Sequence, residues 1–240
     1  MIISPTNQPK SLKQQLLLFL FPEFEFKYIS KNLSLLAKEG KIKTALDFGC
    51  GPGRFLDTLR NHGVQYTGVD ISKSVRDYVR ERGAEALSPE EFTNSTKTFD
   101  CIIMSQIIEH FNHHELLKLF EMLIPKLNKG GYLVIATPCY MNTFYSDFDH
   151  VKPYNPASII QTLAGTSPYF HFGVKIKFKL FKLWYQRRSF CWHHVSWKYT
   201  SRLGARVCML FDIFMAVLFK LSAGIIGENY TWVMFLERAE

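Results

Sequence analysis

The sequence has few cysteines, and none of them forms a C-x-x-C pair. The five are Cys50, Cys101, Cys139, Cys191 and Cys208. An odd number of widely spaced cysteines argues against a disulfide framework or a zinc knuckle and indicates a reducing compartment. The apolar run from Leu16 to Phe21 is short and no small-residue cleavage site follows it. We therefore expect no signal peptide and a cytoplasmic location, with peripheral attachment to the inner membrane face left open.

Acidic residues are scarce in the last third of the chain. The formal net charge is +8, and no Asp or Glu falls between Asp149 and Asp212. Residues 150–240 contain twelve basic and four acidic residues, whereas residues 1–149 contain seventeen of each. This asymmetry predicts an anionic partner, and an anionic membrane surface, a phosphate-bearing substrate and RNA all fit. A basic face that only aids solubility is the simpler interpretation.

The chain also lacks an uninterrupted apolar run of membrane-spanning length. Residues 206–226 approach that length, but Asp212 and Lys220 interrupt them. The segment 181–230 is basic, aromatic and apolar, so we interpret it as an insertion that forms a lid, contacts an anionic membrane face or binds RNA. Residues 1–40 are expected to form a helical lid or anchor of the same kind.

Hydrophobic runs and turn residues alternate from about residue 10 to residue 140. The predicted strands are 44–48, 65–70, 85–87, 99–105 and 132–138, with helices between them. This rhythm predicts an α/β fold with a mostly parallel sheet and helices on both faces, in which ligands bind beyond the carboxyl ends of the strands. We expect the core to occupy 41–180.

Beyond residue 150 the pattern changes. A helix is expected to begin at Pro156, with Asn155 as its cap. The stretch "VKIKFKL" (174–180) alternates apolar residues with lysine, which predicts a strand with one cationic face. A last strand is expected at 231–237, within a final core segment at 231–240.

A glycine-rich turn follows the first strand, in "ALDFGCGPGRF" (45–55). It lacks the third glycine of a dinucleotide fingerprint, because Arg54 stands there, and it lacks the Gly-Lys-Ser/Thr of a Walker loop. Asp47 at the strand end would repel a pyrophosphate but attract an ammonium or sulfonium. Asp70, at the end of the second strand, can accept hydrogen bonds from both hydroxyls of a ribose. A ligand with a cationic amino-acid end and a ribose is S-adenosylmethionine, which we predict as the cofactor.

These motifs resemble those of the class I S-adenosylmethionine-dependent methyltransferases. "LDFGCGPGRF" looks like their first motif, "YTGVDIS" like the acidic motif of the second strand, and "FDCIIMSQIIEHF" like the fourth-strand motif. "LIPKLNKGGYLVIATP" is similar to the approach to their fifth strand. "DHVKPYNPASI" (149–159) resembles a stretch of the ubiquinone-biosynthesis O-methyltransferases and of glycan-cluster methyltransferases. The resemblance covers roughly residues 40–165 plus the last strand. It implies a Rossmann-like seven-stranded sheet whose last strand is antiparallel.

The resemblance also implies a set of cofactor-binding residues. They are Asp47, Gly49, Gly51, Gly53, Asp70, Ile71, Ser88, Ser105 and Gln106. The four residues of the glycine turn would surround the methionine part of the cofactor, and Asp70 would bind the ribose. Ile71 and Ser88 would border the adenine, and the last two residues would lie beside the sulfonium.

Two histidines are candidates for the catalytic base. Methyl transfer to a hydroxyl requires an in-line approach and removal of the acceptor proton, which His110 or His150 could accept. Orienting a loop by hydrogen bonds is the alternative role for both. Some family members bind a divalent metal through E-x-x-E-H, but Gln106 replaces the first carboxylate here, so we expect no metal. His113 and His114 are expected to lie in an exposed, capped first helical turn and not to bind zinc.

Missing motifs narrow the acceptor. The N/D-P-P-Y of adenine-amino methyltransferases is absent after the fourth strand, and Pro138-Cys139 follows the fifth strand, where a cytosine-C5 nucleophile is not expected. We therefore predict O-methylation of a small molecule, a lipid-linked compound or a glycan. An RNA methyltransferase and a non-catalytic S-adenosylmethionine-binding subunit are the alternatives, and the sequence predicts no oligomeric state.

Overall fold

The computed structural model describes residues 24–141, 144–166, 176–191 and 197–239. Contacts group the chain into two compact units. The core unit comprises Glu25–Gln186 and Asn229–Glu240, and the insertion unit comprises Met1–Phe24 and Arg187–Glu228. The two units are described separately.

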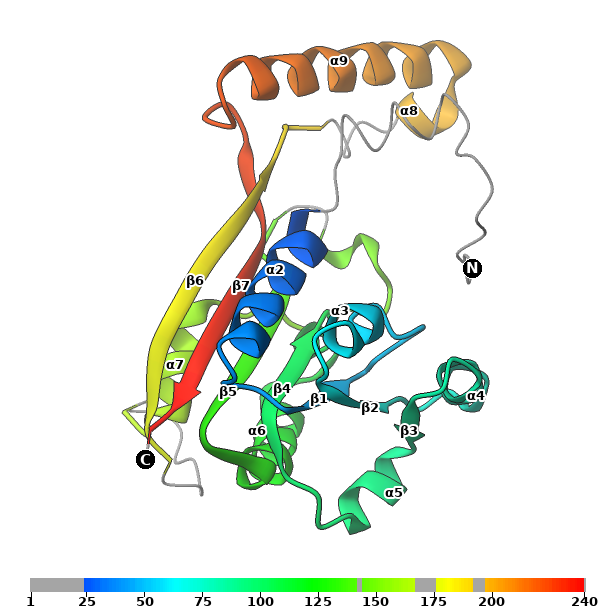
Figure 1. Cartoon of the computed structure of the whole chain (residues 1–240). Helices are drawn as coiled ribbons and strands as arrows, with labels where there is room; N and C mark the ends of the chain where they lie inside the picture. The colour runs from blue at the N-terminus through cyan, green and yellow to red at the C-terminus, as the bar shows by residue number, and fades with distance from the viewer. Residues whose placement is uncertain (1–23, 142–143, 167–175, 192–196, 240) are drawn as a thin grey trace. The chain divides into compact units, whose positions relative to one another are not determined.

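The core unit is built on a seven-stranded sheet with the order β3-β2-β1-β4-β5-β7-β6 (Figure 1). The strands are β1 (Thr44–Phe48), β2 (Gln65–Val69), β3 (Glu85–Leu87), β4 (Phe99–Ser105), β5 (Leu127–Pro138), β6 (Phe178–Arg188) and β7 (Glu228–Arg238). The first five strands pair in parallel, and β7 runs antiparallel to β5. This arrangement confirms the predicted Rossmann-like fold with a mostly parallel sheet and an antiparallel last strand.

Helices cover both faces of the sheet. They are α2 (Phe24–Lys38), α3 (Leu56–Arg60), α4 (Lys73–Glu81), α5 (Pro89–Asn94), α6 (His113–Leu123) and α7 (Pro156–Leu163). Figure 1 shows α2 and α3 in front of the sheet and α6 and α7 behind it. The buried side chains accordingly form two clusters, one with Leu33 of α2 and the other with Phe120 of α6. Ile102 and Ile103 of β4 belong to opposite clusters, because successive strand residues point to opposite faces.

Side-chain caps begin three of the helices, and the cap at Asn155 is the predicted one. Ser88 and Asn112 each form a capping box with the glutamate three residues later, and Asn155 accepts a hydrogen bond from the backbone N–H of Ser158. Ser72 occupies the N-cap position of α4, but its side chain makes no cap hydrogen bond and lies 3.0 Å from the hydroxyl of Ser74. Ser72 therefore holds the N-cap position through its extended backbone and not through its side chain.

The sixth strand lies later in the chain than the sequence predicts. We expected it at 174–180, and it occupies Phe178–Arg188; residues 174 and 175 lie outside the described part of the chain. The alternation of apolar residues with lysine ends near Leu180. Strand β6 nevertheless continues through Trp184 and Tyr185, because an edge strand pairs with a single neighbouring strand and does not need strict alternation. The last strand is confirmed and extends three residues further toward the N-terminus than predicted.

The insertion unit contains a short helix, α8 (Trp197–Thr200), and a long one, α9 (Arg202–Leu221). Ser201 caps α9 through the backbone N–H of Gly204. Among the described residues, none of the helices combines the length and the apolar character that a membrane crossing requires. The predicted N-terminal lid or anchor lies mostly outside the described residues; of that segment the structure describes α2, which belongs to the core unit apart from its first residue.

Candidate functional site

The glycine turn between β1 and α3 is held against the end of β2. The backbone N–H groups of Gly49 and Cys50 both donate to the carbonyl of Val69, over 2.8 and 3.0 Å. Gly49 has a φ of +74°, and a Cβ there would lie 1.9 Å from Cδ1 of Ile107. Gly51 also has a positive φ, +49°, but faces open space. The turn therefore needs glycine at 49 for close packing, and at 51 it presents bare backbone to a ligand.

Asp47 lies beneath this turn and is almost fully buried. The Tyr66 hydroxyl donates a hydrogen bond to its Oδ2 over 2.9 Å. Burial raises the pKa of the Asp47 carboxyl to about 7, although the Tyr66 hydrogen bond and the nearby Arg54 charge oppose the shift. Near neutral pH this group is consequently poised between its two forms, and a cation bound above the turn would favour the ionised one.

Asp70 joins the glycine turn to the beginning of α4. Its Oδ2 accepts the N–H of Gly51 over 3.0 Å, and its Oδ1 accepts the N–H of Ser72 over 2.8 Å. Each carboxylate oxygen keeps a further lone pair, so the two oxygens can still accept from a ribose diol. Ile71, the next residue, is 86% exposed and thus free to cover one face of an adenine.

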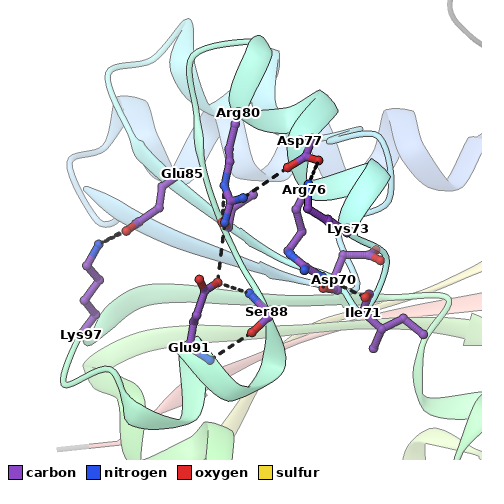
Figure 2. Close-up of polar contacts among 11 residues, drawn as sticks. Asp70, Ile71, Lys73, Arg76, Asp77, Arg80, Glu85, Ser88, Glu91 and Lys97 are labelled. Carbon is purple, nitrogen blue, oxygen red and sulfur yellow. Dashed lines mark hydrogen bonds and ion pairs between the residues drawn. The ribbon is translucent and has the colours of Figure 1, made fainter.

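Arg76, in the first turn of α4, stabilises the connection between β2 and α4 at Asp70 and Ile71. Its Nη1 donates to the carbonyls of Asp70 and Ile71 over 2.8 and 2.9 Å, which Figure 2 shows together with the nearby end of β3. At that end Ser88 uses its hydroxyl as the cap of α5 and its N–H to bind Glu91 Oε2. Ser88 would therefore lie beside an adenine, while its hydroxyl remains bound as the cap of α5.

A residue that the sequence analysis missed lies at the end of β4. Glu25 of α2 accepts hydrogen bonds from Ser105 Oγ over 2.9 Å and from Gln106 Nε2 over 2.7 Å. Gln106 has a φ of +58°, unusual for a residue with a side chain. The N–H of Glu25 in turn donates to Oε1 of Gln186. Eighty residues separate Glu25 from Ser105, so no local motif could have identified the pair.

The two predicted histidines lie together just beyond β4. Their ring centroids are 5.2 Å apart. The N–H groups of Val151 and Lys152 donate to the carbonyl of Glu109, which attaches the segment carrying His150 to the segment carrying His110. The resemblance to E-x-x-E-H gave the first histidine and the "DHVKPY" stretch gave the second, and the fold brings them to one place.

Glu109 is the buried member of this cluster. Its Oε2 accepts the Thr137 hydroxyl over 2.8 Å, while its Oε1 is buried and has no hydrogen-bond partner within the described part of the chain. Burial raises the pKa of the Glu109 carboxyl, against the effect of hydrogen bonds and of the two histidines. Ligand atoms of Glu109, His110 and His150 all lie within 4.8 Å of one another. These three residues are the ones that could hold a divalent cation, a role the sequence analysis did not expect.

Among the described residues, His113, His114 and Cys139 are not part of the Glu109, His110 and His150 cluster. His113 and His114 lie in the first turn of α6, where Asn112 caps the helix, as expected. His114 is exposed as predicted, whereas His113 is half-buried. Their rings contact each other with centroids 3.9 Å apart. Burial raises the pKa of the Cys139 thiol to about 11, so it is protonated and a poor nucleophile at neutral pH.

Comparison with known proteins identifies the family of the chain. The sequence pattern of a family described as a methyltransferase domain matches residues 21–189. A ubiquinone biosynthesis O-methyltransferase from Coxiella burnetii is 27% identical over 128 residues, which are 50% of this chain and 52% of that protein. The chain thus aligns with about half the length of such curated relatives.

Solved structures share the fold. The magnesium protoporphyrin IX methyltransferase of Synechocystis, solved with bound S-adenosylhomocysteine, superimposes with a TM-score of 0.57 and 10% identity, over 98% of this chain and 90% of that one. The N-methyltransferase NodS of Bradyrhizobium japonicum gives a TM-score of 0.53 and 13% identity, over 91% and 99% of the two chains. The family pattern over most of the sequence and the sheet order together show that the chain belongs to the class I S-adenosylmethionine-dependent methyltransferases.

Proposed function

We propose that the chain methylates an oxygen atom of a small molecule, a lipid-linked compound or a glycan. The observation that carries the catalytic part of this proposal is the arrangement of His110 and His150, and the choice of oxygen comes from similarity to an O-methyltransferase. Nδ1 of His110 lies 3.0 Å from the carbonyl of Asp149, and Nδ1 of His150 lies 2.7 Å from the carbonyl of Phe144. A carbonyl can only accept, so each Nδ1 carries the proton and the lone pair of a neutral ring lies on Nε2.

A lone pair on Nε2 is what a general base needs. Asp147 supports this role at His150, because its Oδ2 lies 3.7 Å from Nε2 and would stabilise the positive charge gained with the acceptor proton. In the proposed reaction the acceptor oxygen attacks the methyl carbon, the carbon–sulfur bond breaks toward sulfur, and the acceptor proton passes to a histidine Nε2. S-adenosylmethionine supplies the electrophilic methyl group when bound.

The other residues bind and orient. The turn at Gly49–Gly53, Asp70 and Ile71 would hold the methionine, ribose and adenine parts in that order along the strand ends. Ser105, Gln106 and Glu25 would lie at the reacting end, since Ser105 ends β4 and Gln106 is attached to β5 through the carbonyl of Ala136 over 2.8 Å. Holding the acceptor in line with the methyl group accounts for much of the catalysis in such a reaction.

Oxygen is favoured as the acceptor atom by similarity to the ubiquinone biosynthesis O-methyltransferase, which also favours a lipid-linked substrate. A nitrogen acceptor is the competing proposal, supported by the fold shared with NodS. An acceptor amine and an acceptor hydroxyl both have a proton to lose, so the histidine cluster serves either.

Radiolabelled methyl transfer into a cell extract tests the proposal. The labelled extract is divided into lipid, water-soluble glycan, RNA and protein fractions, and label in lipid or glycan is expected. A His110→Ala, His150→Ala double variant should lose about 10²–10⁴-fold in turnover while still binding S-adenosylhomocysteine. His114→Ala is the matched control and should leave turnover unchanged. Label confined to RNA, or full activity of the double variant, would overturn the proposal.

Cofactor binding is tested separately at Asp70. Asp70→Ala removes both ribose acceptors and leaves the N–H groups of Gly51 and Ser72 without their present partner, so affinity for S-adenosylhomocysteine should fall at least tenfold. Asp77→Ala on the exposed side of α4, where Asp77 pairs with Lys73, is the control. Equal affinity of the Asp70 variant and the wild type would contradict the ribose assignment.

A further inference from the structure

Helix α9 of the insertion unit has an exposed face that is almost entirely apolar. We call its members the apolar face of α9: Leu203, Leu210, Ile213, Phe214, Val217 and Leu221. The last five follow one another at helical spacing, and exposed Arg206 lies between Leu203 and Leu210. Leu210, Phe214 and Leu221 are 63%, 58% and 79% exposed. A helix at a protein surface normally presents polar residues there, so this face is suited to another environment than water.

The opposite side of α9 is already packed. Gly204, Cys208 and Ala216 are buried, at spacings of one and two turns, and Asp212 on the same side is half-buried. Small side chains at these positions permit close packing on this side. The helix therefore has one buried side and a second, larger side that is apolar and exposed.

The charges on the outward side are all of one sign. Among the exposed residues of α9 the charged ones are Arg202, Arg206 and Lys220, at the two ends of the helix. The single acid of α9, Asp212, is not among them. An apolar centre with cations at both ends complements an apolar layer below negative charge.

We propose that α9 lies along the surface of an anionic lipid bilayer, with its apolar face among the acyl chains and its arginines and lysine at the headgroups. Twenty residues at 1.5 Å each give a helix of about 30 Å lying in the membrane plane. The structure also favours this position over a crossing, because no described helix is apolar enough to span.

A second copy of the chain is a weaker occupant of the same face. Antiparallel pairing of two α9 helices would place Arg202 and Arg206 of one copy near Lys220 of the other, and parallel pairing would place like residues together. Either way cations approach cations while apolar surface is buried, with no acid on the exposed side to compensate. This inference concerns attachment and does not depend on which acceptor the enzyme methylates.

Sedimentation of the full chain with vesicles tests the proposal. Vesicles of phosphatidylcholine with phosphatidylglycerol should bind the protein at low salt, more tightly than vesicles of phosphatidylcholine alone, and added salt should weaken the binding. Leu210→Ser with Phe214→Ser should lower the partition coefficient at least tenfold. Arg202→Gln with Arg206→Gln should lower binding to the anionic vesicles only.

Two kinds of control separate loss of membrane binding from loss of folding. Leu35→Ser replaces a comparably exposed leucine on α2, in the core unit, and should bind vesicles as the wild type does. Retained binding of S-adenosylhomocysteine and an unchanged melting temperature show that the α9 variants are folded. The assignment would be overturned if the protein bound no vesicles at low salt, or if the Leu210, Phe214 variant bound them as well as the wild type. It would also be overturned if RNA retained the protein and vesicles did not, or if the protein formed a dimer that the same variant dissociates.

Discussion

Gln106 donates a hydrogen bond from Nε2 to Oε2 of Glu25 over 2.7 Å. The bond joins the helix before β1 to the residue that follows β4, and Ser105 secures the other oxygen of the same carboxylate. Gln106 occupies the position at which the family's metal-binding motif has a glutamate. A glutamate there would repel Glu25, so the amide and the carboxylate form a matched pair.

Glu25→Gln should therefore lower methyl transfer. The variant keeps its shape but loses the charge-assisted bonds to Ser105 and Gln106, each worth about 1.5–3 kcal/mol, so we expect kcat/KM to fall about 10–100-fold. Steady-state kinetics with both substrates varied measure the effect. Glu39→Gln, which removes an exposed carboxylate paired with Lys41, is the control. Wild-type kinetics in the Glu25 variant would show that the pair has no part in the reaction.

Asp47 should make the cofactor-free protein less stable as the pH rises. Its pKa of about 7 in the folded chain lies above the ordinary value of 3.8, so the folded state binds more protons than the unfolded state between these values. Stability from this group is full below about pH 4 and is lost as the pH rises through 7. At about 1.4 kcal/mol per pKa unit the loss amounts to a few kcal/mol.

Thermal unfolding of Asp47→Asn measures this effect. The variant should melt higher than the wild type at pH 8 and should show a flatter pH dependence, while it binds the cationic cofactor more weakly. Asp100→Asn is the opposite control. Although burial opposes it, hydrogen bonds from Asn128 and from the N–H groups of Lys43 and Thr44 lower the pKa of Asp100. That variant should melt lower at pH 8, and a lower melting point for Asp47→Asn as well would contradict the assignment.

Gly49→Ala should destabilise the protein far more than Gly130→Ala. Both glycines have φ near +70°, which costs an alanine about 1 kcal/mol. A Cβ at 130 meets no atom within 4 Å, whereas one at 49 would lie 1.9 Å from Ile107. Chemical denaturation of the two variants gives the comparison. Equal losses would mean that Ile107 moves aside at little cost.

Divalent metal should not be required for activity. The Glu109, His110 and His150 set has one carboxylate, and the amide of Gln106 is bound to Glu25, so a hard cation such as Mg²⁺ would find a single charged oxygen donor in the set. Dialysis against a chelator should leave turnover unchanged. Loss of activity that Mg²⁺ or Mn²⁺ restores would assign the unpartnered Oε1 of Glu109 to a cation.

Local signals in the sequence predicted local structure well. The strands at 44–48, 85–87 and 99–105 begin and end where predicted, because turn residues bound short apolar runs. The capping boxes of Ser88 and Asn112 formed for the same reason, since all their partners lie within one helical turn. The motifs beside the glycine turn placed Asp70 at the end of β2, beside that turn, and its ribose-binding role stays a prediction.

Features that depend on distant residues were missed. Glu25 meets Ser105 through the packing of α2 against the sheet, and the sequence around Glu25 resembles any amphipathic helix. The unpartnered Oε1 of Glu109 could not be predicted, because its burial and its hydrogen bonding both depend on how distant segments pack in the fold. The start of β6 was predicted at the wrong residue. Alternation of apolar residues with lysine indicates only that one face is exposed, whereas the strand begins where it pairs with its neighbour in the sheet.

The position of β7 between β5 and β6 has a consequence for synthesis on the ribosome. Ile135 of β5 pairs with Met234 of β7. The edge of β5 that faces β7 therefore gains its partner only after almost a hundred further residues have been translated. Until then residues 131–138 of β5, all buried in the folded protein, present unpaired N–H and C=O groups along that edge. The nascent chain therefore carries an unpaired strand edge while almost a hundred residues are added, and Arg187–Glu228 of the insertion unit are made within that interval.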